Sequence, residues 1–145
     1  MQTLILYATK SEATGECASM LAKKLKNCPT YNLEQTTPDI TAFDMIIIGT
    51  GVRMGKIYKP VLNFIRKNLD LLLTKAVAIY FCNAYPDTFQ KAIDKNIPIE
   101  LTNHSVCIKS FGGKPAFTNP TNETWLNMKN IDDFIGIITS QIAAD

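Results

Sequence analysis

The feature that most constrains the fold is an unbroken apolar run at residues 45–48, which follows Asp44 and ends at Gly49. A strand with one face in water would alternate apolar and polar residues. A continuous run is instead typical of a strand buried on both faces of a parallel sheet. Similar runs occur at residues 3–8 and 75–82. Since parallel strands need long crossover connections, these runs predict an α/β protein.

Segments with helical periodicity separate the apolar runs. Residues 15–25 repeat apolar side chains every three or four positions, and so does the last segment, with Ile131, Phe134, Ile135, Ile138 and Ile142. We predict strands at residues 3–8, 30–33, 44–49, 75–82 and 105–111, a loop at 50–56, a short helix at 88–95 and an extended or irregular segment at 97–101. The alternation predicts one domain, residues 1–145, with a doubly wound five-stranded parallel sheet, right-handed crossovers and helices on both faces.

Composition excludes several classes of protein. The 46% hydrophobic and 19% charged fractions of the 145 residues are ordinary for a globular domain. No apolar run approaches the ~18 residues needed to cross a bilayer. The net charge of +2 comes from scattered basic residues, without the basic stripe of a nucleic-acid-binding protein. With no signal peptide visible, we expect a cytoplasmic protein with four reduced cysteines and no metal site.

The loop after the first strand predicts an anion site, because it leads into a helix whose first N–H groups lack internal partners. Its residues are Thr9, Lys10, Ser11, Glu12, Ala13 and Thr14. It contains neither the Gly-x-x-x-x-Gly-Lys of a nucleoside triphosphate site nor the Gly-x-Gly-x-x-Gly of a dinucleotide site. Hydroxyl groups would supply the donors here. The alternative is that the loop only caps the helix.

The pattern Thr9-x-Ser11-x-x-Thr14 resembles the phosphate loop of the flavodoxin family, which wraps the phosphate of flavin mononucleotide (FMN). Glu12 stands where that family usually has glycine. The flavodoxin-like strand order, 2-1-3-4-5, places the ligand at the carboxyl ends of strands one and three. The loops that leave those strands here are residues 9–14 and 50–56, so motif and expected topology agree.

Within this superfamily the chain is most similar to single-domain members that include the quinone-dependent protoporphyrinogen dehydrogenases. The likeness rests on residues 6–14, on residues 48–56 with the sequence Ile-Gly-Thr-Gly-Val-Arg-Met-Gly-Lys, and on residues 109–114. Those dehydrogenases carry a long insertion late in the chain. Here only a short loop joins Gly113 to the last helix.

The resemblance implies FMN as the cofactor and assigns its contacts. The phosphate would be held by Thr9, Lys10, Ser11, Ala13 and Thr14 with the backbone of Glu12. One side of the flavin ring would be lined by Thr50, Gly51, Val52, Arg53, Met54 and Gly55. The other side would be formed by Asn83, Ala84 and Tyr85, with Tyr85 as the stacking ring.

Three functions remain open from the sequence. The first is an FMN-binding redox protein that passes electrons between partner proteins or small molecules. The second is an FMN-dependent dehydrogenase of protoporphyrinogen or another quinone-linked substrate. The third is a flavin-free α/β interaction domain, which Glu12 in the phosphate loop would favour. Because Arg53 and Lys56 would stabilise an anionic reduced flavin, we also expect a potential less negative than that of low-potential flavodoxins.

Overall fold

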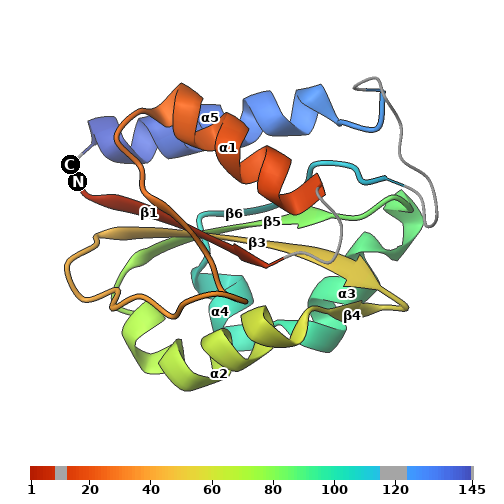
Figure 1. Ribbon diagram of the computed structural model, residues 1–145, viewed down its shortest axis with the longest axis horizontal. Coiled ribbons are helices and arrows are strands. Elements are labelled where there is room, and N and C mark those ends of the chain that lie inside the picture. Colours follow the sequence, from red (N-terminus) through yellow and green to blue (C-terminus); the bar gives the residue numbers. More distant parts are fainter. Residues whose placement is uncertain (9–12, 115–123, 145) are drawn as a thin grey trace.

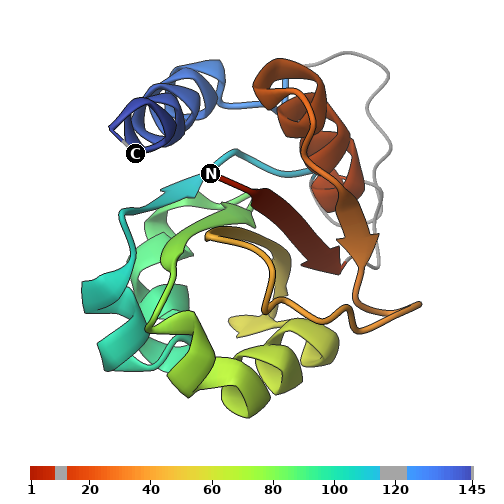
Figure 2. The ribbon, with the colours of Figure 1, turned by 90° about the vertical axis from the view of Figure 1, so that its left-hand side faces the viewer.

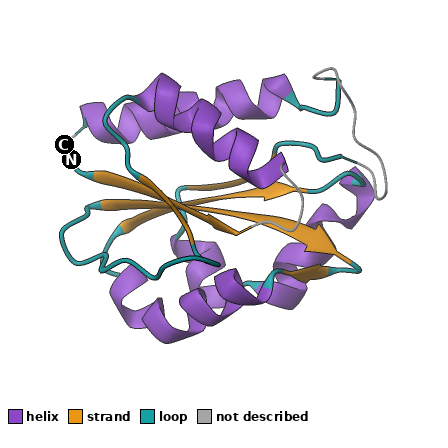
Figure 3. Ribbon diagram, in the orientation of Figure 1, coloured by secondary structure: helices purple, strands orange, loops and turns teal. Residues whose placement is uncertain are grey.

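The computed structural model describes residues 1–8, 13–114 and 124–144. A central sheet separates two layers of helices (Figures 1 and 3). Helices α1 (Ala13–Leu25) and α5 (Met128–Ala143) cover one face. Helices α2 (Lys59–Leu72), α3 (Phe89–Asn96) and α4 (Ile99–His104) cover the other. The predicted doubly wound arrangement is confirmed.

Five parallel strands form the sheet in the order β2-β1-β3-β5-β6. They are β1 (Thr3–Ala8), β2 (Thr30–Asn32), β3 (Met45–Arg53), β5 (Ala76–Cys82) and β6 (Cys107–Ser110). This order is the predicted 2-1-3-4-5, counted over the parallel strands. A sixth strand, β4 (Lys56–Ile57), pairs antiparallel with the end of β3 and was not predicted.

The segment at residues 97–101, predicted to be extended or irregular, is extended at Ile97 but helical from Ile99. Helix α4 begins at Ile99, directly after Pro98, whose φ of −54° is compatible with a helix start. Leu101 turns inward from this helix and is completely buried. A six-residue helix is too short to show helical periodicity in the sequence, so this element was missed.

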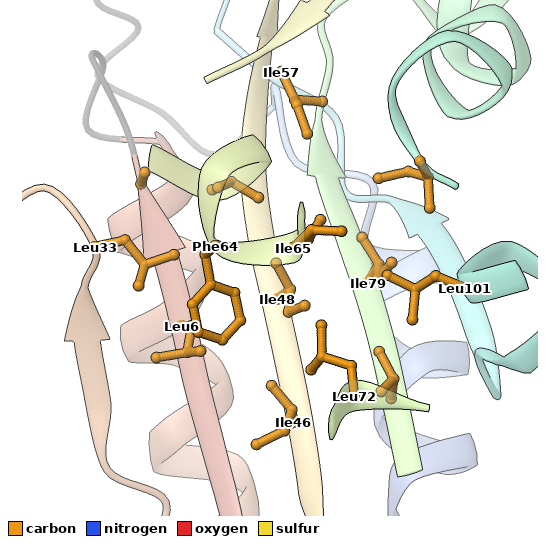
Figure 4. Close-up of a cluster of buried hydrophobic side chains, with 14 of the residues drawn as sticks. Leu6, Leu33, Ile46, Ile48, Ile57, Phe64, Ile65, Leu72, Ile79 and Leu101 are labelled. Atoms are coloured by element: carbon orange, nitrogen blue, oxygen red, sulfur yellow. The ribbon is translucent and has the colours of Figure 1, made fainter. Parts of the chain in front are cut away.

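Each face of the sheet has its own hydrophobic core, because alternate side chains of one strand point to opposite faces. On the side of α2, Leu6, Ile46, Ile48 and Ile79 pack against helix residues such as Phe64, Ile65 and Leu72 (Figure 4). On the other side, strand residues including Ile5, Ile47 and Tyr80 pack against α1 and α5. The central strands are therefore buried on both faces, as their apolar runs predicted.

The carboxyl ends of the central strands meet at one edge of the sheet. Ala8 at the end of β1 pairs with Thr50, and Gly51 pairs with Cys82 at the end of β5. From this edge β1 leads to α1 on one face, whereas β3 leads to α2 on the other (Figure 1). The two termini lie at the opposite end of the sheet, as Figure 1 and the rotated view of Figure 2 both show. The winding of the chain thus reverses between β1 and β3, where doubly wound proteins bind ligands.

Candidate functional site at the carboxyl edge of the sheet

Part of the predicted phosphate loop lies at the start of α1. Thr9, Lys10, Ser11 and Glu12 fall outside the described residues, whereas Ala13 and Thr14 form the first turn of the helix and are buried. The Thr14 carbonyl accepts a hydrogen bond from the Tyr80 hydroxyl at 3.0 Å. This bond fixes the helix start on β5, 66 residues further along the chain.

The Thr14 hydroxyl is completely buried and has no hydrogen-bond partner among the described residues. The sulfur of Cys82 lies near it without forming a hydrogen bond of normal geometry. An unsatisfied buried hydroxyl costs about 1–3 kcal/mol. A bound oxyanion would supply an acceptor for this group and for the free N–H groups at the helix start. The donors described here therefore fit a phosphate ligand.

A lysine side chain reaches the same helix turn. Lys114 follows β6, and its Nζ donates to Glu16 Oε1 at 2.9 Å, with its side chain only 8% exposed. The same ammonium lies 5.2 Å from the centre of the Trp125 ring, a cation–π contact. Sequence reasoning did not give Lys114 a role, since 98 residues separate it from Glu16. The available sequence signal for a role of Lys114 was its place in segment 109–114, which resembles the protoporphyrinogen dehydrogenases.

Two buried thiols pack beneath the helix start. The sulfurs of Cys17 and Cys82 lie 3.7 Å apart, and all four cysteines are free. The hydrogen bond with Cys17 and burial raise the pKa of the Cys82 thiol well above its usual value. A neutral thiol is a poor nucleophile, which agrees with a packing role for Cys82.

Residues 50–56, predicted as a loop, are mostly strand residues of a hairpin. β3 continues through Arg53, and the chain then turns back into β4 so that Arg53 pairs with Lys56. Met54 and Gly55 occupy the turn with φ values of 53° and 77°, which place both in the left-handed region. A two-residue hairpin of this kind favours Asn-Gly, so a methionine at its first position is strained.

The base of this hairpin is tightly packed. The Thr50 hydroxyl is buried, donates to the Gly51 carbonyl at 2.9 Å and accepts from the Tyr58 amide at 3.4 Å. A Cβ at Gly51 would lie 2.6 Å from the Tyr58 hydroxyl. Gly51 is therefore required by the approach of the Tyr58 ring, which the sequence could not indicate.

Asn96 at the end of α3 holds the other side of the hairpin. Its Nδ2 donates to the Gly55 carbonyl at 2.9 Å and to Ala92 at 2.8 Å. Its Oδ1 accepts from the Ile57 amide at 3.3 Å. One side chain thus fixes the turn on a helix that begins more than 30 residues later. Val52 is half-buried, whereas Arg53, Met54 and Lys56 are exposed.

The third predicted segment follows β5. Asn83 is buried, its Nδ2 donates to the Thr88 hydroxyl at 2.9 Å, and its Oδ1 accepts from the Tyr85 amide at 3.2 Å. Tyr85 is 60% exposed. A Cβ at Gly113 would lie 2.9–3.1 Å from backbone atoms of Asn83 and Ala84, so the segment after β6 supports this loop. The structure thus brings Ala13, Thr14, the hairpin and residues 83–85 to one edge of the sheet.

A sequence profile described as Flavodoxin domain matches residues 4–119. The match includes all three predicted site segments and most of the chain. The chain belongs to the flavodoxin domain family. The predicted family is therefore confirmed.

Solved flavodoxins share this fold over nearly the whole chain. The flavodoxin of Fusobacterium nucleatum, solved with bound flavin mononucleotide, has a TM-score of 0.64 and 16% identity and covers 97% of this chain and 99% of its own. A short-chain flavodoxin associated with a non-canonical PDU bacterial microcompartment has a TM-score of 0.68 and 17% identity over the same shares. At these identities the likeness concerns the flavodoxin fold.

A curated relative is similar in sequence. Protoporphyrinogen IX dehydrogenase (quinone) of Escherichia coli K12 is 30% identical over 90 residues, which cover 57% of this chain and 49% of that enzyme. The predicted likeness to this branch of the flavodoxin family is confirmed. The chain spans about half the length of the curated relatives it matches.

Two further observations bear on the function. Within the part of the chain that the structure describes, no helix combines the length and apolar character needed to span a bilayer. In the same part, no three His, Cys, Asp or Glu side chains gather as metal ligands could.

Proposed function

We propose that this flavodoxin-domain protein binds FMN at the carboxyl edge of the sheet and passes electrons between partner proteins or small molecules. The observation that carries the proposal is the unpartnered, buried Thr14 hydroxyl at the start of α1, where the chain winding reverses. FMN in a solved flavodoxin of the same fold supports the choice of ligand. When bound, FMN would accept and release one or two electrons.

The residues of this chain would bind and orient the flavin. Thr9, Lys10, Ser11, Glu12, Ala13 and Thr14 would hold the phosphate through hydroxyl and backbone donors. The hairpin residues Thr50, Gly51, Val52, Arg53, Met54 and Gly55 would line one side of the ring. Asn83, Ala84 and Tyr85 would line the other, and the exposed Tyr85 ring would stack on the flavin.

An absorption spectrum followed by FMN titration tests the proposal. We expect flavin absorbance in the purified protein, or quenching of FMN fluorescence when FMN is added to colourless protein. Thr14→Val keeps the shape of the side chain and removes its donor, so it should weaken FMN binding about tenfold. Thr139→Val, at an exposed position of α5, is the matched control and should leave FMN affinity unchanged.

Two results would contradict the proposal. If the protein neither contains nor binds FMN at micromolar concentrations, the hypothesis of a flavin-free interaction domain is favoured instead. If Thr14→Val and Thr139→Val bind FMN equally well, the phosphate is held elsewhere.

A second function has one specific observation in its favour. The 30% identity to the Escherichia coli enzyme supports an FMN-dependent dehydrogenase of protoporphyrinogen or another quinone-linked substrate. The short connection from Gly113 to α5, in place of a long insertion, opposes it. Turnover of protoporphyrinogen IX with a soluble quinone by the FMN-loaded protein would favour this function. FMN binding without such turnover would favour the electron-transfer function over the dehydrogenase.

A further inference from the structure

Cations collect in one stretch of the chain. Between Met45 and Leu69 there is no carboxylate, whereas five of the 15 lysines and arginines occur there: Arg53, Lys56, Lys59, Arg66 and Lys67. The hairpin carries the first two, on paired positions of β3 and β4. The whole chain has a net charge of only +2, so this region is far more basic than the average.

A neighbouring helix adds to this charge. A Cβ placed at Gly55 would lie 3.9 Å from Nζ of Lys95, which brings the α3 lysine beside the turn. The single carboxylate of α3, Asp94, accepts a hydrogen bond from Gln90 at 2.9 Å. Arg53, Lys56 and Lys95 are all exposed and form no ion pair with a described residue. None of the three cations is therefore neutralised by a direct ion pair with a described residue.

The centre of this basic surface is apolar. Met54 at the hairpin tip is 92% exposed, the largest value among the exposed large hydrophobic residues that the structure describes. Tyr85, 60% exposed, extends from another loop at the same edge of the sheet. Methionine, tyrosine and arginine are enriched in protein–protein interfaces, where an apolar centre is surrounded by a polar rim.

The hairpin presents Met54 in a fixed and unfavourable conformation. The left-handed φ of 53° disfavours methionine, and an asparagine would occupy the position more readily. Asn96 nevertheless holds the turn from both sides through the Gly55 carbonyl and the Ile57 amide. A strained, exposed apolar residue on a braced turn indicates selection for something other than folding. A pre-organised surface also loses less entropy on binding.

We propose that the hairpin at residues 53–56, flanked by Lys59 and Lys95, is a docking surface for an acidic redox protein. Met54 inserts into the partner, and the surrounding cations pair with its carboxylates. This inference rests on the proposed electron-transfer function, and it names the charge of the partner. The hairpin also lines the predicted flavin site, so docking there brings the two redox centres close together.

The test measures binding in protein without flavin, so that it does not depend on FMN. The probes are an acidic plant-type [2Fe–2S] ferredoxin, and basic cytochrome c as the opposite charge. Fluorescence anisotropy of dye-labelled protein should show ferredoxin binding that weakens about tenfold between roughly 20 and 200 mM salt. Cytochrome c should not bind under either condition.

Charge variants localise the surface. Arg53→Gln with Lys56→Gln should weaken ferredoxin binding about tenfold. Lys23→Gln with Lys24→Gln removes the same charge from exposed positions at the far end of α1 and should change binding less than about twofold. Thermal melting would check that both double variants fold. Equal loss of binding in the two pairs would show that only net charge matters and would overturn the proposal.

Met54→Asn separates docking from folding. The substitution relieves the strained turn and should raise the melting temperature by about 2–4 °C. It also removes the apolar tip and should weaken ferredoxin binding about threefold or more. A higher melting temperature with unchanged binding would make Met54 a turn residue only and would overturn its role in docking.

Two further outcomes would reject the acidic partner. One is tighter binding to cytochrome c than to ferredoxin. The other is binding to vesicles containing about one-third phosphatidylserine with no binding to ferredoxin, which would assign the surface to anionic lipid. Since FMN titration is a separate measurement, failure of docking and failure of flavin binding are distinguished.

Discussion

The first residues of α1 are buried and are held by a contact that crosses to β5. The residues of the β3–β4 turn are instead exposed to solvent. Thr14 is fully buried and bonded through its carbonyl to Tyr80. Met54 is 92% exposed and strained. Substitutions on the buried side should therefore act on stability and cofactor binding together. Substitutions on the hairpin should act on function with little loss of stability.

The largest loss of stability is expected from a substitution at Gly49 in β3, against which the Tyr80 ring packs. A Cβ at Gly49 would lie 2.0 Å from Cζ of Tyr80, a ring that is fully buried and stacked on Phe111 at 4.7 Å. Gly49→Ala should therefore lower the free energy of unfolding by about 3 kcal/mol, measured by urea denaturation.

Gly136→Ala is the matched control. Nothing lies within 4 Å of the Cβ that would be added at this exposed position of α5. Alanine in a helix interior should raise stability by about 0.5–1 kcal/mol. If both alanine variants shifted stability in the same direction, the claim that the Tyr80 ring packs closely on Gly49 would be contradicted.

A smaller effect is expected for Tyr80→Phe. The variant keeps the stacked ring and removes the hydrogen bond to the Thr14 carbonyl, leaving a buried acceptor unpaired. We expect a loss of about 1–2 kcal/mol in the free energy of unfolding and weaker FMN binding. Tyr31→Phe, at an exposed position of the edge strand, provides the comparison and should change neither quantity. Unaltered FMN affinity in Tyr80→Phe would show that this hydrogen bond is not needed to position α1 for FMN binding.

The same side chain makes stability depend on alkaline pH. Burial, followed by the nearby Cys82, Cys17 and Tyr7, raises the pKa of Tyr80 well above its usual value. Below pH ~10 both the folded and the unfolded tyrosine keep their proton, so this stability is fully present. Above that pH the unfolded tyrosine ionises first, and stability falls as pH rises. The difference between wild type and Tyr80→Phe in urea melts should therefore shrink above pH ~10; a difference that grew would reverse the sign.

The smallest effect concerns the hairpin and the flavin. Arg53→Glu should lower the midpoint potential of bound FMN by about 20–60 mV, because it replaces a cation that favours the reduced anion with a carboxylate. Stability should hardly change, since Arg53 is exposed. Lys24→Glu makes the same charge change at the far end of α1 and should leave the potential unchanged. Redox titration measures both, and an unmoved potential in Arg53→Glu would place the ring away from the hairpin.

Much of the fold could be predicted because it depends on local patterns. The apolar runs at residues 3–8, 45–48 and 75–82 became β1, the core of β3 and β5, since strands buried on both faces carry few polar residues. The order of the parallel strands followed from the alternation with helices. The errors arose where short segments depend on partners elsewhere, as in β4 on β3 and in the buried Leu101 of α4.

The candidate site was less accessible to sequence reasoning. Ala13, Thr14, the hairpin and residues 83–85 were expected at one edge, and they meet there. Their assignment as FMN contacts stays a prediction. The pairing of Lys114 with Glu16 and the brace from Asn96 to Gly55 join residues 98 and 41 positions apart. No local pattern contains such distances, and the exposure of Met54 contradicts the usual preference of methionine for the interior.

The brace has one more consequence. Strand β4 lies at the margin of the hairpin, where free N–H and C=O groups could pair with the same segment of another molecule. The carboxamide of Asn96 offers one donor and one acceptor, as a peptide bond does, and occupies Gly55 O and Ile57 N. A single side chain thus takes the place of a neighbouring strand. Asn96 therefore covers two backbone groups of the hairpin that would otherwise be open to pairing with another strand.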